Sequence, residues 1–192
     1  LYADAADHYG FSWTETGHTR LFSGDTLIGE SDFAAFGFFA VPPEPGEYRI
    51  EVESIRGGPA LLSTQVNLAW SFRSEQVAEG ETAVLPVMAV RMMPPLDDFN
   101  RAPAGRWFAI PLSVSRQPGA PAPPLRRLTL EASFDGGAAW QPVFVLRIGD
   151  FGLALLRHPD GDGTVSLRAG ATDRDDNAAV QTILDGYGMG EP

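Results

Sequence analysis

Apolar and polar residues alternate along several segments of this chain. Every second side chain is apolar in residues 47–53, and the same period of two recurs in residues 128–134 and 165–171. A period of two is typical of a β-strand with one face on a core and the other in water. Turn-forming Gly, Asp and Asn residues separate these segments at 23–25, 135–137, 160–163 and 173–177. We therefore expect an all-β fold of antiparallel strands packed as β-sandwiches.

The pattern also indicates two units. Strand-like apolar runs at residues 61–72 and 87–93 flank a segment without such a run, and we place a boundary there. Residues 1–85 carry 13 acidic and 4 basic side chains, whereas residues 86–192 carry 12 and 10, so the units differ in surface charge. We predict an N-terminal β-sandwich domain at residues 1–82 and a second β-sandwich domain at residues 83–192.

A dense aromatic run, Phe33, Phe36, Phe38 and Phe39, lies in the first unit. We expect it to be a buried strand that fills the core of that unit. The alternative is a partly exposed patch on which a partner docks.

Composition narrows the classes of function. The net charge of -11 opposes binding to nucleic acid or to an anionic membrane, so we expect neither as a partner. The absence of cysteine excludes disulfides, thiolate nucleophiles and cysteine-based zinc sites. No apolar run approaches the roughly 18 residues of a membrane-spanning helix. Because the chain opens at Leu1 without a charged leader, we expect an excised fragment or a processed product.

Several longer motifs resemble a known family. Residues 128–142 (LTLEASFDGGAAWQP) and 164–187 (TVSLRAGATDRDDNAAVQTILDGY) resemble the immunoglobulin-like or fibronectin-like domain near the C-terminus of secreted actinobacterial subtilisin-like serine peptidases. Residues 19–30, 46–53 and 62–74 are similar to the preceding β-domain of the same proteins. The resemblance implies an immunoglobulin/fibronectin III-like fold for residues 83–192, an extracellular location, and the catalytic domain of the same polypeptide as partner. Asp176 replaces a glycine of the family's turn, which Asp tolerates in the left-handed region.

A catalytic site of its own is not expected in this chain. A serine hydrolase needs a nucleophilic hydroxyl, a histidine base and an orienting carboxylate. The available histidines are His8, His18 and His158, and none lies in a recognisable catalytic motif. We expect them to be exposed or in loops.

Two acidic turns are candidates for calcium, since that ion selects carboxylate and amide oxygens. The candidate ligands are Asp160 and Asp162 in one turn and Asp173, Asp175, Asp176 and Asn177 in the other. Neither turn has the twelve-position EF-hand pattern, and Asx turns account equally well for these residue types. No other cofactor is expected.

Tryptophans offer a second kind of site, because exposed aromatic rings stack on sugars in many β-sandwich modules. Trp13 and Trp107 are the candidates for an exposed binding surface. Trp70 and Trp140 lie in or beside strand patterns, and we expect them in the core or packed over a hairpin.

The leading hypothesis is a non-catalytic C-terminal region of a secreted subtilisin-like peptidase that stabilises the enzyme or contacts a protein or polysaccharide substrate. The alternative is a carbohydrate-binding or adhesion module of another extracellular protein. A third is a hydrolase with an unrecognised site.

Overall fold

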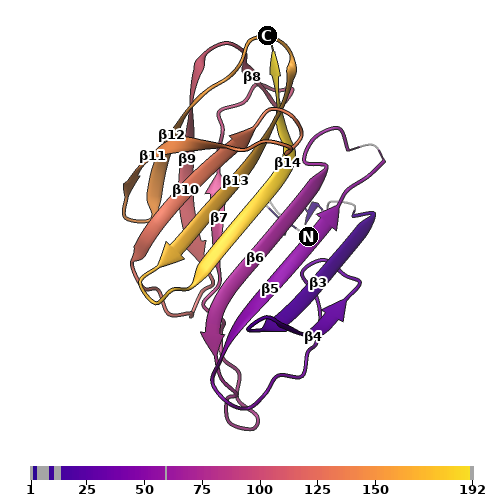
Figure 1. Cartoon of the computed structure of the whole chain (residues 1–192), viewed down its shortest axis with the longest axis vertical. Helices are drawn as coiled ribbons and strands as arrows, with labels where there is room; N and C mark the ends of the chain where they lie inside the picture. Colours follow the sequence, from indigo (N-terminus) through magenta and orange to yellow (C-terminus); the bar gives the residue numbers. More distant parts are fainter. Residues whose placement is uncertain (1, 4–8, 11–13, 59, 191–192) are drawn as a thin grey trace.

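The protein is described by a computed structural model that covers residues 2–3, 9–10, 14–58 and 60–190 (Figure 1). All of its regular elements are strands, and the described residues contain no helix, hence none that is long and apolar enough to cross a membrane. The strands are β1 (Tyr2–Ala3), β2 (Tyr9–Gly10), β3 (Thr16–Ser23), β4 (Thr26–Ser31), β5 (Gly46–Ile55), β6 (Gln65–Ser74), β7 (Met88–Met92), β8 (Arg101–Pro103), β9 (Trp107–Arg116), β10 (Leu125–Ser133), β11 (Gln141–Ile148), β12 (Phe151–Arg157), β13 (Gly163–Asp173) and β14 (Ala178–Gly190). The predicted all-β class is confirmed.

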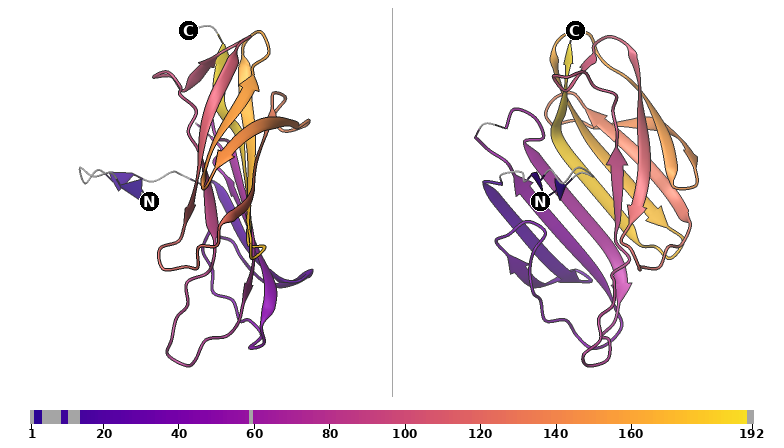
Figure 2. Two further views of the ribbon diagram at one scale, coloured as in Figure 1. Left: turned by 90° about the vertical axis from the view of Figure 1, so that its left-hand side faces the viewer. Right: turned by 180° about the vertical axis from the view of Figure 1, so that it is seen from behind.

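Strands β7 to β14, which we call the C-terminal part, form a two-layer sandwich, seen edge-on in the left view of Figure 2. One layer has the strand order β7-β9-β12-β11, and the other has the order β10-β13-β14. β11 passes between the layers, because residues 141–143 pair with β10 and residues 144–148 pair with β12. If the short β8 is left out, β7 and β9 to β14 are seven strands in chain order. Strands one, two, five and four of this series form one layer and strands three, six and seven form the other, which is the strand order of an immunoglobulin constant-type sandwich. The immunoglobulin-like prediction for this part is confirmed by that order.

The core of the sandwich comes from the alternation that the sequence shows. Inward positions of both layers are almost fully buried, including Ile110, Leu130, Ala154, Val165 and Tyr187. The predicted strands at residues 128–134 and 165–171 correspond to β10 and β13, which pair antiparallel from Arg127 to Ser133. Burial of these apolar side chains is the main force that holds the layers together.

The N-terminal part differs from the predicted second sandwich. Its strands β4-β3-β5-β6 form one antiparallel layer, which continues the sheet of the C-terminal part as β6 pairs with β14 (Figure 1). The face of this layer that bears Leu21, Tyr48 and Phe72 is covered by loop segments that contribute Phe39, Leu85 and Val87. The expectation of a buried strand for the aromatic run was wrong, because residues 32–45, between β4 and β5, form no strand.

Two contacts join the parts. The β6–β14 ladder runs from Ala178 opposite Ser71 to Leu184 opposite Gln65. The indole Nε1–H of Trp70 in β6 donates to the carbonyl of Met88 in β7 at 2.6 Å, and Trp70 packs against both clusters of buried apolar residues. The boundary at residues 82 and 83 falls between β6 and β7 and stays a prediction, while the sheet is continuous across the two parts.

Candidate binding surfaces

Large apolar side chains cover the solvent side of the layer formed by β9, β12 and β11. In this ladder Phe144 lies opposite Leu155, Leu146 opposite Leu153, and Ile148 opposite Phe151. Side chains two residues apart on a strand share a face, so all these pairs point away from the core. We call this surface the outer face; its large members are Trp107, Phe144, Leu146, Ile148, Phe151, Leu153 and Leu155, with exposed fractions from 44% to 77%.

The outer face exposes more apolar surface area than the largest apolar patch of a typical monomer. Those fractions amount to roughly 800 Å² of apolar side-chain surface, taking aromatic side chains at about 200 Å² and aliphatic ones slightly lower. Ala109 and Pro111 of β9 lie opposite Leu155 and Leu153, and make the surface continuous across three strands. The largest apolar patch of a typical monomer is about 300–600 Å², and larger patches mark interaction sites.

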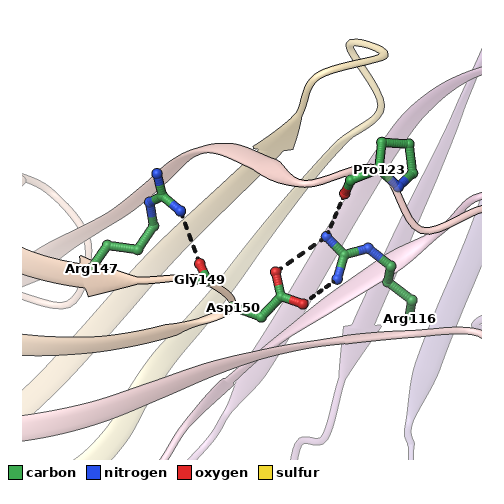
Figure 3. A network of polar contacts seen from close by, with 5 residues as sticks. All are labelled: Arg116, Pro123, Arg147, Gly149 and Asp150. Atoms are coloured by element: carbon green, nitrogen blue, oxygen red, sulfur yellow. Dashed lines mark hydrogen bonds and ion pairs between the residues drawn. The ribbon is translucent and has the colours of Figure 1, made fainter.

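An ion pair fixes the hairpin that carries this surface (Figure 3). Asp150, in the turn between β11 and β12, receives hydrogen bonds from Arg116 at the end of β9, at 2.6 and 3.3 Å. The same guanidinium donates to the carbonyl of Pro123 at 2.9 Å, which ties in the proline-rich loop. Because Arg116 is only 12% exposed, this bidentate pair is better shielded than a surface ion pair. It holds the β11–β12 hairpin against the end of β9.

Sequence reasoning missed the outer face. The sequence does contain a signal for this surface, because residues 143–148 and 151–156 are apolar at nearly every position rather than at every second one. Such runs are typical of strands that are covered on both faces. In the structure one face is covered by the sandwich core and the other is open.

A second exposed apolar group lies in the N-terminal part. The rings of Phe33, Phe36 and Phe38 contact one another edge to face, with centroids 6.3 and 5.5 Å apart. Their exposed fractions are 67%, 57% and 90%. We call residues 32–41 the aromatic loop. Its position agrees with the alternative of an exposed docking patch.

The aromatic loop borders an apolar cleft of about 420 Å³ beside the edge of β7. Leu21, Tyr48 and Phe72 form its floor, while Phe36 and Phe39 belong to its wall. The Thr19 hydroxyl donates to the Phe33 carbonyl at 2.6 Å and anchors the loop to β3. The cleft therefore lies where the second layer of the sandwich ends and only loop segments cover the sheet.

The calcium candidates lie at opposite ends of β13. Asp160 and Asp162 precede the strand, and Asp162 pairs with Arg101 at 3.0 Å. The buried carboxylate of Asp173 accepts from the backbone N–H of Asp175 and of Asn177, and from the Asn177 side chain, at 2.9 to 3.0 Å.

These contacts make the Asp173 turn an Asx turn that closes the β13–β14 hairpin. Asp176 pairs with Arg126 and has φ of 64°, as expected where Asp replaces glycine. In the described part of the chain, no three His, Cys, Asp or Glu side chains form a group that could hold a metal ion. Whether calcium binds stays a prediction.

The histidines have structural environments. His158 lies in the loop between β12 and β13, which agrees with the expectation of an exposed or loop histidine, but its side chain is buried. Its Nδ1 lies 2.8 Å from the Pro103 carbonyl and its Nε2 lies 2.9 Å from the Tyr187 hydroxyl. Burial lowers the pKa of His158 and raises the pKa of Tyr187. Both ring nitrogens of His158 are thus engaged, and His158 and Tyr187 form a hydrogen-bonded pair in the core.

His18 is half-buried and lies 3.3 Å from Asp32, while His8 falls outside the described residues. No hydrogen bond of the described residues joins a histidine to a serine.

The tryptophans divide largely as expected. Trp107 is 66% exposed and belongs to the outer face, whereas Trp13 lies outside the described residues. Trp70 is partly buried between the two clusters, as described above. Trp140 is half-buried, with the Arg168 guanidinium 4.0 Å from its ring centroid.

Comparison with known proteins identifies no family. No family model matches the chain, and no curated protein matches its sequence. A structure of fibronectin(III)-like modules of CbhA from Clostridium thermocellum is similar over 95% of this chain and 79% of that one, at 13% identity and a TM-score of 0.34. A TM-score of that size does not establish a shared fold, so the sandwich is assigned from its strand order.

Proposed function

We propose that this chain is a non-catalytic accessory region that acts by binding, and that it belongs to the C-terminal part of a secreted subtilisin-like serine peptidase. The observation that carries the binding role is the outer face, where seven large apolar side chains are exposed on one side of a β-sheet. The peptidase assignment is supported by the sequence resemblance of residues 128–142 and 164–187.

In this proposal the protein is extracellular and shares a polypeptide with the catalytic domain. It stabilises the enzyme or contacts a protein or polysaccharide substrate, and it binds neither nucleic acid nor membrane. The net charge of -11 supports the exclusion of these two anionic partners.

The gene tests the peptidase assignment. The reading frame upstream of Leu1 should encode a domain with catalytic Asp, His and Ser residues; a frame without one would overturn the assignment. The non-catalytic role is tested on the purified chain, which should hydrolyse no member of a peptide and ester library.

A carbohydrate-binding or adhesion module is the second candidate, favoured by the exposed ring of Trp107 at the end of the outer face. It predicts that a glycan array retains the chain and that Trp107→Ala abolishes retention. Trp140→Ala, which changes a half-buried ring, is the matched control.

A further inference from the structure

The two exposed apolar surfaces of this chain complement each other in charge. Arg157 lies opposite Trp107 in the β9–β12 ladder, and Arg91 lies opposite Ser113, which is itself opposite Phe151. Both arginines therefore project on the side of the outer face. Along the described strands β9, β11 and β12, no outward-facing position carries an acidic side chain. The outer face is therefore apolar at its centre and has Arg91 and Arg157 at its rim, while Asp150 in the adjoining β11–β12 turn is paired with Arg116.

The aromatic loop has the opposite character. The segment of residues 32–45, which links β4 to β5, contains Asp32 and Glu44 and no basic residue. Both carboxylates are exposed and flank the rings of Phe33 and Phe38 along the chain, and Asp32 lies 3.3 Å from His18. This loop is therefore apolar at its tip and negative around it.

We propose that the outer face of one copy of this protein binds the aromatic loop of a second copy, so that copies associate head to tail. This inference goes beyond the proposed function and does not depend on the peptidase assignment. It accounts for two apolar surfaces that folding alone leaves exposed.

Charge decides between this arrangement and the symmetric one. Packing two outer faces against each other would place Arg91 and Arg157 of both copies at the rim of the contact, where no outward-facing position of β9, β11 or β12 offers an acidic partner. Placing Asp32 of the loop and Glu44, three residues beyond the loop, at that rim gives attraction instead. The local attraction also offsets the general repulsion between copies of net charge -11.

The available area sets the expected strength. The three exposed rings of the aromatic loop offer roughly 400 Å² of apolar surface, about half of what the outer face exposes. Together with the flanking polar contacts, the interface would bury about 1,000 Å² in total, which is at the low end for specific complexes. We therefore expect reversible association rather than a permanent oligomer.

The contact is heterologous, because it joins two different surfaces. Each bound pair keeps one free outer face and one free aromatic loop, so a third copy can add at either end. Association should therefore produce species larger than a dimer.

Two variants and their mixture test this arrangement. The face variant carries Phe144→Thr, Leu146→Thr and Ile148→Thr, and the loop variant carries Phe33→Ser and Phe38→Ser. Sedimentation velocity of the 192-residue chain from about 5 to about 500 µM should show growth beyond the dimer, as expected for a small interface. Each variant alone should stay monomeric, because it lacks one of the two surfaces.

An equimolar mixture of the two variants should form a dimer that does not grow, since each retains the surface that the other has lost. Leu61→Ser, which changes an 85% exposed side chain outside both surfaces, should associate like the original chain. A monomeric original chain, a loop variant that still dimerises, or a mixture that stays monomeric would each refute the head-to-tail contact.

The contribution of charge to association is tested separately, at exposed positions whose substitution should not affect folding. Arg91→Glu combined with Arg157→Glu changes two exposed side chains and should abolish association. Raising the salt concentration should weaken association of the original chain, because exposed charges are screened. Association that is unchanged by both treatments would contradict the charge argument and with it the choice of the head-to-tail arrangement.

Discussion

Replacing Trp70 by Phe tests how the two parts of the sheet are held to the second layer. Trp70 lies in β6, and its indole N–H donates to the carbonyl of Met88, whose residue is only 3% exposed. The substitution keeps an aromatic ring but removes the donor and part of the ring volume.

The expected loss follows from these contacts. An unpaired buried carbonyl costs about 1–3 kcal/mol, because it has lost water without gaining a partner. The missing ring of the indole leaves a small void between the two apolar clusters, which adds roughly 1 kcal/mol. We expect Trp70→Phe to lower the free energy of unfolding by about 2–4 kcal/mol.

Urea unfolding followed by far-UV circular dichroism measures this change without relying on tryptophan fluorescence. Trp140→Phe is the matched control, because that ring is half-buried under Arg168, and it should cost about 1 kcal/mol or less. If Trp70→Phe costs no more than Trp140→Phe, the indole contact does not hold the layers together and the reasoning fails.

Three further predictions concern single side chains. Arg116→Met should lower the free energy of unfolding in urea by about 1–2 kcal/mol, because it removes the pair with Asp150. Arg147→Met, which removes one exposed hydrogen bond to a backbone carbonyl, should cost under about 0.5 kcal/mol. Equal costs would contradict the role of the Arg116 pair. Burial lowers the pKa of His158 below 6.5, so below that pH the unfolded chain binds a proton that the folded chain does not. The free energy of unfolding should therefore decrease as the pH falls below 6.5, by at most about 1.4 kcal/mol per pH unit. A His158→Gln chain with the same slope would refute this cause. Asp173→Ala should lower the free energy of unfolding by about 2–4 kcal/mol, because it leaves amides of the turn unpaired. A chelator should not shift the melting midpoint of the original chain, and a large shift would show that the acidic turns hold calcium.

The strands that could be predicted from the sequence are those with one face in water. Residues 47–53 became β5, and residues 165–171 lie within β13, because alternation fixes which side chains face the core. The Asp173 turn was also predictable, since Asp and Asn close hairpins through their own side chains.

The pairing of β6 with β14 could not be predicted in this way. The paired residues are more than 100 positions apart, and no local pattern specifies which distant strand lies beside an edge. The aromatic loop was misjudged because four phenylalanines within residues 33–39 resemble a buried strand in composition, although their spacing has no period of two. The outer face was missed because apolar residues on both sides of a strand indicate burial, and here one side is left for binding.

The central claim is that the outer face serves binding and not folding. The most direct test is the free energy of unfolding of the face variant, Phe144→Thr with Leu146→Thr and Ile148→Thr, beside Leu130→Ala on the inward side of the sandwich. Threonine keeps the preference for a strand, so the three exposed changes together should cost under about 2 kcal/mol. Leu130 is 1% exposed, and its single change should cost about 2–5 kcal/mol. A face variant that loses more stability than Leu130→Ala would show that the outer face belongs to the core and would contradict the account.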